Sequence, residues 1–98
     1  MALKHDAFAL AANTPLAIAT IPAGNPRTSV IVSNTDSASI FIGDSSVVTG
    51  NTVDRGIKVA TGTNQEVWLN AGDVLYAVSL AGTGSAYNVS VLYSNVLP

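Results

Sequence analysis

Apolar and polar residues alternate along much of this chain, and a period of two restricts the fold more than any other feature of the sequence. Side chains of a β-strand point in turn to the two faces of its sheet, so an alternating stretch has one face suited to a core. Within residues 27–34, Val30 and Val32 point one way, and Ile31 points the other way between two serines. Further stretches alternate in the same manner and favour β-branched or aromatic residues: residues 38–43, 65–70, 73–81 and 86–95.

Turn-forming residues separate the alternating stretches. Two prolines and a glycine make residues 22–26 a loop. Asparagine, aspartate or glycine makes residues 34–37, 70–73 and 81–85 suitable for tight hairpins, and two more strands are predicted, over residues 14–21 and 56–60. Short strands with a turn at intervals of roughly 8–12 residues are typical of an all-β domain. We therefore expect a small antiparallel β-sandwich, jelly-roll-like or immunoglobulin-like.

The first 13 residues are predicted as an N-terminal arm or edge strand, and residues 14–98 as a single β-sandwich domain, which suits the length of the chain. Residues 7–12 are rich in alanine, yet Phe8 and Leu10 alternate as in a strand. An arm can add a strand to a neighbouring sheet through main-chain hydrogen bonds, so Phe8 and Leu10 are candidate interface residues. Deletion of residues 1–12 is then expected to leave the sandwich folded and to weaken assembly.

Charged side chains are scarce and scattered. They make up 10% of the chain, against roughly 25% in an ordinary soluble domain. The basic residues Lys4, Arg27, Arg55 and Lys58 form no cluster, so we expect no nucleic-acid partner. No apolar run approaches the ~20 residues that cross a bilayer, so we expect no membrane partner. Low charge suits a surface that is buried against a partner, although a neutral surface of hydroxyls and amides is an alternative.

Side chains that carry out catalysis or bind metals are few. The chain has one histidine, His5, and no cysteine, so one chain lacks the usual ligands of a transition-metal site. His5 lies near the terminus, where a Ser/His/Asp arrangement would not hold it rigidly. Most aspartates lie in turns, and a calcium site from Asp44 and Asp54 lacks the dense acidic spacing of calcium loops. We therefore expect no enzyme, no cofactor and no metal.

Residues 43–55 interrupt the alternation and are predicted as a loop of about a dozen residues, with a short strand at 46–49. Loops of that length are uncommon in small domains unless they carry function or contact a partner. Asp44, Asp54 and Arg55 in this loop are therefore candidate interface residues.

Aromatic residues divide between the two faces of the predicted strands. Trp68 lies between Val67 and Leu69, so it is expected to project outward, where a tryptophan can anchor an interface. Ordinary packing of Trp68 is the alternative. The tyrosines alternate in phase with valines and are expected in the core or at its rim: Tyr76, Tyr87 and Tyr93.

Several short motifs follow one another in an order that is similar to a known group of proteins. They are TPL at 14–16, RTSVIVSN at 27–34, SIFIG at 39–43, VVTG at 47–50, RGI at 55–57, AGDVLYAVS at 71–79 and YNVSVLYS at 87–94. Over residues 14–95 the chain thereby resembles small β-sandwich virion proteins of tailed bacteriophages. The resemblance is one of strand and turn types, and it carries over no catalytic residue. It implies a place on a capsid exterior, in a head fibre or in a tail.

The resemblance and the low charge together predict a non-enzymatic capsid decoration or cement protein, which binds the assembled shell through its sheet surface and its N-terminal arm. Its partners would be the major capsid protein or other virion proteins, and it would be a homo-oligomer, with a trimer expected. It would be made in the host cytoplasm and lie on the capsid exterior. The alternative is a carbohydrate- or receptor-binding module of a head fibre or tail, with Trp68 and the 43–55 loop in its site. A third hypothesis is a hydrolase domain, which would need paired carboxylates in a cleft.

Overall fold

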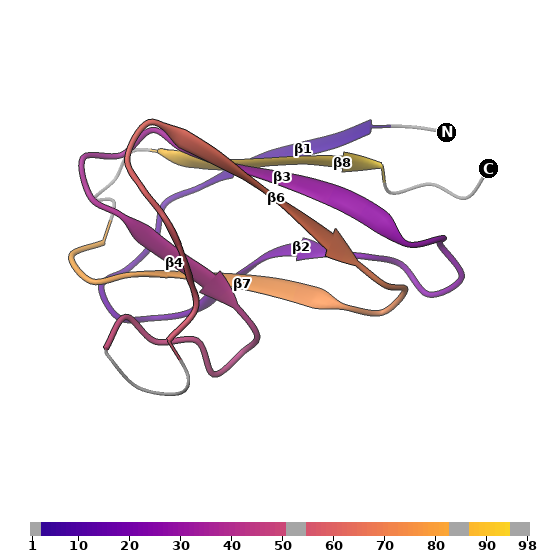
Figure 1. Ribbon diagram of the computed structural model, residues 1–98, viewed down its shortest axis with the longest axis horizontal. Helices are drawn as coiled ribbons and strands as arrows, with labels where there is room; N and C mark the ends of the chain where they lie inside the picture. The colour runs from indigo at the N-terminus through magenta and orange to yellow at the C-terminus, as the bar shows by residue number, and fades with distance from the viewer. Residues whose placement is uncertain (1–2, 51–54, 83–86, 95–98) are drawn as a thin grey trace.

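The computed structural model describes residues 3–50, 55–82 and 87–94. Within these ranges the chain forms eight β-strands and no helix, as the alternation predicted. Figure 1 shows the strands in two layers that run along the long axis of the molecule. The strands are β1 (Leu3–Phe8), β2 (Leu16–Thr20), β3 (Thr28–Asn34), β4 (Ile40–Gly43), β5 (Ile57–Val59), β6 (Thr63–Leu69), β7 (Val74–Ser79) and β8 (Val89–Ser94).

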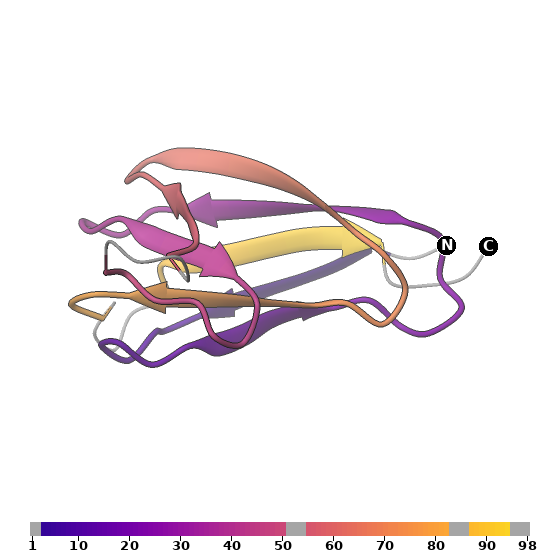
Figure 2. The same cartoon turned by 60° about the horizontal axis from the view of Figure 1, so that its bottom comes forward.

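The strands form two antiparallel four-stranded sheets that pack against each other (Figure 2). Sheet A has the order β1-β8-β3-β6, and sheet B has the order β2-β7-β4-β5. Among the strands of the described residues, only β4 and β5 are consecutive and hydrogen-bond to each other, and every other pair of consecutive strands is divided between the two sheets. This is the order of an eight-stranded jelly roll. An immunoglobulin-like sandwich would keep several consecutive pairs within one sheet, so the jelly-roll expectation is the one confirmed.

The predicted hairpins at residues 34–37 and 70–73 are wrong, because each of these turns joins strands of different sheets. The turns themselves are present. At residues 70–73, Gly72 has a φ of 83°, and the Asn70 backbone N–H donates to Asp73 Oδ2 at 2.8 Å. The connection at residues 81–85 also crosses between sheets, and its residues 83–85 lie outside the described ranges. Turn chemistry reverses the chain, but it does not decide which sheet the next strand joins.

The core lies between the sheets and is made by the strand faces that the alternation assigned to it. Val30 and Val32 of β3 and Ile40 and Ile42 of β4 are buried, while Phe41 faces outward and is half-buried. In β8 the buried residues alternate as Val89, Val91 and Tyr93. The cluster is completed by Leu10, Ile18, Ala19, Ile21, Val59, Leu69, Leu75 and Ala77.

One buried amide fixes the crossing from β3 to β4. Asn34 is fully buried at the end of β3, and its Nδ2 donates to the carbonyl oxygens of Ala38 and Val59, both at 2.9 Å. Its Oδ1 accepts from the backbone N–H of Asp36 at 3.0 Å. Because Val59 belongs to β5, this side chain links the two sheets and satisfies polar groups that the core would otherwise leave unpaired.

The N-terminal segment is an edge strand and not a free arm. β1 pairs with β8 along its whole length, from Leu3 opposite Ser94 to Phe8 opposite Val89. Leu10 is only 2% exposed and belongs to the core, and the backbone N–H of Asn13 donates to the Ser79 carbonyl at 2.8 Å. Residues 3–13 are therefore part of the sandwich.

The tyrosines show where alternation alone misleads. Tyr93 is buried as predicted, but Tyr87 precedes β8 and is 73% exposed. Tyr76 shares a face of β7 with Val78, and that face is the outer one of sheet B. Val78 is buried on that outer face and is not part of the inter-sheet core. The alternation of Tyr76 with Val78 therefore did not identify the inner face of β7, which carries Leu75 and Ala77.

Candidate interaction surface

The acidic side chains of the described part of the chain mostly support turns. The Ser46 hydroxyl and backbone N–H donate to Asp44 Oδ1 at 2.6 and 2.9 Å, and they hold the pKa of Asp44 below its usual 3.8. Asp36 accepts from Asn88 Nδ2 at 3.0 Å. Among the described residues, no three His, Cys, Asp or Glu side chains gather to hold a metal, and no helix there could span a membrane.

The outer face of sheet A is broad and almost without charge. Cross-strand pairing places His5, Leu92, Ile31 and Glu66 in one row over the four strands. The next row is Ala7, Ser90, Ser33 and Asn64. At the other end of the face, Leu3 lies opposite Ser94, and Ser29 lies opposite Trp68. We call these twelve residues the sheet A face.

Exposed apolar side chains lie on three neighbouring strands of the sheet A face. Leu3 is 72% exposed, and Ile31 and Leu92 are each about 40% exposed. The carboxylate of Glu66 accepts a hydrogen bond from Ser29 Oγ at 2.7 Å, so its charge is engaged within the face. The remaining positions hold three serines, one asparagine, His5, Ala7 and Trp68. A face of this kind loses little on desolvation and gains from apolar burial, which suits contact with another protein.

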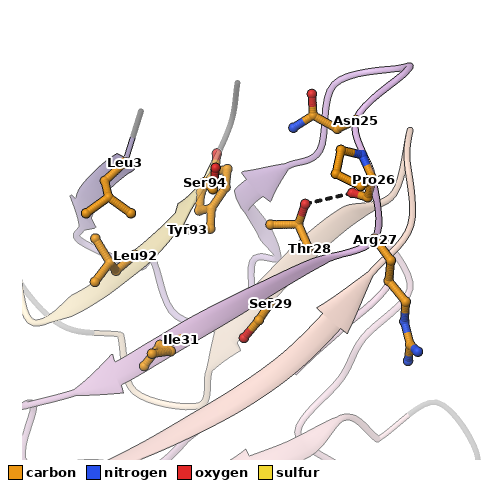
Figure 3. Close-up of a pocket in the computed structure, with 10 residues that line it drawn as sticks. All are labelled: Leu3, Asn25, Pro26, Arg27, Thr28, Ser29, Ile31, Leu92, Tyr93 and Ser94. Atoms are coloured by element: carbon orange, nitrogen blue, oxygen red, sulfur yellow. Dashed lines mark hydrogen bonds between the residues drawn. The ribbon is translucent and has the colours of Figure 1, made fainter. Parts of the chain in front are cut away.

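Two shallow hollows lie on this face, and Ile31 and Leu92 line both of them. The first, of about 340 Å³, is drawn in Figure 3, where Leu3, Leu92 and Ile31 come from three neighbouring strands of sheet A. The second, of about 410 Å³, extends toward His5 and Asn64. Both are open depressions in a surface, so they accept side chains of a partner more readily than they enclose a small molecule.

Trp68 stands at the β6 end of the face and projects outward as predicted, with 52% of its surface exposed. The guanidinium of Arg27 lies over its ring, 5.4 Å from the centroid. In Figure 3 the Arg27 side chain extends away from the hollow formed by Leu3, Leu92 and Ile31. At an exposed site such a cation–π contact contributes about 0.5–1 kcal/mol. Arg27 and Trp68 together border the β6 side of the sheet A face.

The loop after β4 packs onto its own sheet. Val47 is buried against Gly43 and Gly56, and a Cβ on Gly56 would overlap both the Val47 side chain and the Ile42 carbonyl. The predicted short strand at residues 46–49 is not formed. Its place is taken by a single parallel bridge between Val48 and Arg55. A hollow of about 440 Å³ beside the loop is lined by Asn13, Pro15, residues 45–50 and Val78, none of which belongs to sheet A.

The candidate interface residues from the sequence are not brought together. Trp68 lies on the sheet A face, whereas Asp44 and Arg55 are exposed beside sheet B. Phe8 packs against the core from the inner side of β1. Leu10 is itself a core residue, so its side chain does not reach a partner and we withdraw it as a contact. Asp54 lies outside the described residues.

Trp68 is the one residue of the sheet A face that the sequence identified as a candidate; the exposed Leu3, Ile31 and Leu92 and their neighbour His5 were among those it did not identify. Ile31 carried a signal, since the alternation already pointed it away from Val30 and Val32. The register that places Ile31 beside Leu92 and His5 joins strands from opposite ends of the chain. No local pattern specifies such a register.

Comparisons of the chain with protein-family models, with curated proteins and with solved structures find no match. The resemblance to phage virion proteins therefore stays a prediction, and the sheet A face is interpreted from its own chemistry.

Proposed function

We propose that this chain is a non-enzymatic structural subunit of a virion, a capsid decoration protein that binds the assembled shell through the sheet A face. Its partners would be the major capsid protein or other virion proteins, and it would lie on the capsid exterior after synthesis in the host cytoplasm. We also propose that it acts as a homo-oligomer. The expected sheet surface and N-terminal arm become one surface in this proposal, because β1 is a strand of sheet A.

The observation that carries the proposal is the sheet A face itself. Twelve outward positions include one histidine and one carboxylate, and the carboxylate is hydrogen-bonded to Ser29. Exposed Ile31 and Leu92 lie in the middle of this face, and exposed Leu3 lies at its β1 end. An apolar area of this kind on a small domain is characteristic of a contact with another protein. Jelly rolls include viral capsid domains, but a fold by itself does not decide function.

Co-sedimentation with assembled shells tests the proposal, with the unassembled shell protein as comparison. Ile31→Arg places a charge in the middle of the sheet A face, and we expect it to lower affinity for shells at least about ten-fold. Ile57→Arg is the matched control, since Ile57 is 63% exposed on β5 of sheet B. Equal binding by the parent and Ile31→Arg would contradict the proposal, as would loss of binding by Ile57→Arg alone.

A second candidate function is carbohydrate or receptor binding in a head fibre or tail, and the exposed Trp68 favours it. The 43–55 loop does not join this site, since its described residues lie beside sheet B. Sugar rings stack on exposed aromatic faces, and one face of Trp68 is already covered by Arg27. Trp68 is the sole tryptophan of the chain, so its fluorescence reports on this site directly. Titration with host-surface polysaccharides should shift its emission, and an unchanged spectrum at millimolar sugar would rule this candidate out.

A further inference from the structure

β1 has a side on which another strand can add. One side of β1 pairs with β8, and no strand of the described part of the chain lies beyond its other side. The backbone groups on that side are available to a further strand. The edges of sheet B are less suited to this, because β5 has three residues and β2 has a register shift between Ala17 and Ala19.

The charges on β1 are arranged symmetrically about His5. Lys4 and Asp6 flank His5 and are opposite Tyr93 and Val91 of the core, so they lie on the inner side of the edge. Their side chains are about 45% exposed, and Lys4 Nζ is 3.6 Å from Asp6 Oδ2. The other long edge strand, β6, contains a single charged residue, Glu66, and has no such arrangement.

Two copies of β1 can pair about a two-fold axis in only one register that satisfies these charges. For the two core faces to lie on the same side of a joined sheet, residues directly opposite must have side chains on the same face. Those registers centre on a residue of β1, and the ones that bring Lys4 or Asp6 opposite a charged residue of β1 centre on Lys4, His5 or Asp6. A centre at Lys4 places lysine opposite lysine, and a centre at Asp6 places aspartate opposite aspartate. A centre at His5 places each Lys4 opposite the Asp6 of the other copy.

We propose that two copies of this chain associate by antiparallel pairing of their β1 strands, with the two-fold axis at His5 and each Lys4 opposite the Asp6 of the other copy. The contact is self-complementary, as a two-fold interface requires. It joins the two A sheets into one sheet of eight strands, and the two sheet A faces become continuous. Because the contact is two-fold, we expect a dimer from this edge and not the trimer expected from the sequence.

The contact is small and its strength is correspondingly limited. One pair of six-residue strands falls at the low end of interface size, below about 1,200 Å², so dimerisation should depend on protein concentration. The proposal does not rest on the proposed function, since it concerns only contacts between copies. In the opposing interpretation, Lys4 and Asp6 are edge charges that prevent strand addition.

Charge reversal separates the two interpretations. Lys4→Asp gives a β1 with two aspartates, and Asp6→Lys gives a β1 with two lysines. In the proposed register each variant alone brings like charges together, and we expect self-association at least about ten-fold weaker than in the parent. An equimolar mixture brings opposite charges together twice, so heterodimers should form. Sedimentation across a concentration series measures the association, and native mass spectrometry identifies the heterodimer.

The outcomes decide the proposal in either direction. Parent dimers, weakened single variants and a heterodimer in the mixture support it. A monomeric parent at all concentrations overturns it, and so does a mixture no more associated than its components. Far-UV circular dichroism confirms that each variant is folded.

A cysteine cross-link provides a second test that does not depend on charge. The chain has no cysteine, so His5→Cys can form only an intermolecular disulfide. Residues opposite each other in antiparallel strands have Cα atoms roughly 4.5–5.5 Å apart, within the range for a disulfide. The matched control is Asn64→Cys, an exposed position on β6 at the other edge of sheet A. We expect His5→Cys to cross-link at least about ten-fold faster under mild oxidation, and equal rates would overturn the proposal.

Discussion

Leu10→Ala tests whether the N-terminal segment belongs to the core. Leu10 is 2% exposed and packs in the core cluster, so the substitution leaves a cavity between the sheets. Such truncations lower the free energy of unfolding by about 2–5 kcal/mol. For a domain of this size the total is about 5–15 kcal/mol, and the midpoint of thermal unfolding should fall by roughly 10 °C or more. Deletion of residues 1–12, which also removes β1, should therefore unfold the domain.

Urea unfolding measures the effect of Leu10→Ala, followed by the fluorescence of Trp68 and by circular dichroism. Leu80→Ala is the matched control, since the same side chain is lost from a position that is 65% exposed. We expect the control to change the free energy of unfolding by less than about 0.5 kcal/mol. If the free energy of unfolding of Leu10→Ala equals that of the control, and its slope against urea concentration is unchanged, Leu10 is not a core residue and the N-terminal segment is an arm.

Three further outcomes are expected. Val91→Asp should unfold the domain, because it buries an unpaired charge, whereas Leu92→Asp on the outer face should stay folded; circular dichroism distinguishes them, and a cooperatively folded Val91→Asp would show that the faces are wrongly assigned. Gly56→Ala should lower the free energy of unfolding by about 3 kcal/mol or more, because its Cβ would meet backbone atoms. Gly43→Ala should lower it by less, because its Cβ would lie 3.2 Å from the Val47 side chain, which can shift; equal losses for the two variants in urea unfolding would contradict this. The lowered pKa of Asp44 means that its turn contributes stability above pH 3.8, which is lost as the pH falls through the lowered pKa. Asp44→Asn should therefore be destabilising at pH 7, with a difference from the parent that shrinks below pH 3.8; a difference independent of pH would refute the assignment.

Strand faces could be predicted from the sequence because they depend on residues two positions apart. Val30 and Val32, and Ile40 and Ile42, are buried as the alternation indicates, and Trp68 projects outward. Sheet membership could not be predicted in the same way. The turns after β3 and β6 were identified, but their local chemistry is equally compatible with a hairpin and with a crossing to the other sheet.

Burial on the outer side of sheet B was also beyond local patterns. Val78 is covered although it does not face the inter-sheet core, and Val47 from the loop after β4 is buried on Gly43 and Gly56. This packing requires two glycines on different strand ends to lie side by side. Only the three-dimensional arrangement shows why these glycines are needed.

Only part of the sheet A face could be predicted from the sequence. Outward positions within one strand, such as Ile31 and Trp68, follow from alternation. Their grouping with Leu92 and His5 depends on pairing between β1, β8 and β3. The sequence therefore did not predict that these residues share one surface. It predicted interface residues in the loop of Asp44 and Arg55, which lies beside sheet B.

The pairing of β1 with β8 has a consequence for the biosynthesis of this protein. Leu3 is paired with Ser94 across the β1–β8 ladder, and ribosomes synthesise Leu3 long before Ser94. A nascent polypeptide carries β1 without its hydrogen-bonding neighbour until β8 has left the exit tunnel. Non-local pairing of this kind slows folding, and unpaired strands are prone to aggregate meanwhile. Yield in a cell should therefore depend on chaperones and on growth temperature more than the modest size of the domain suggests.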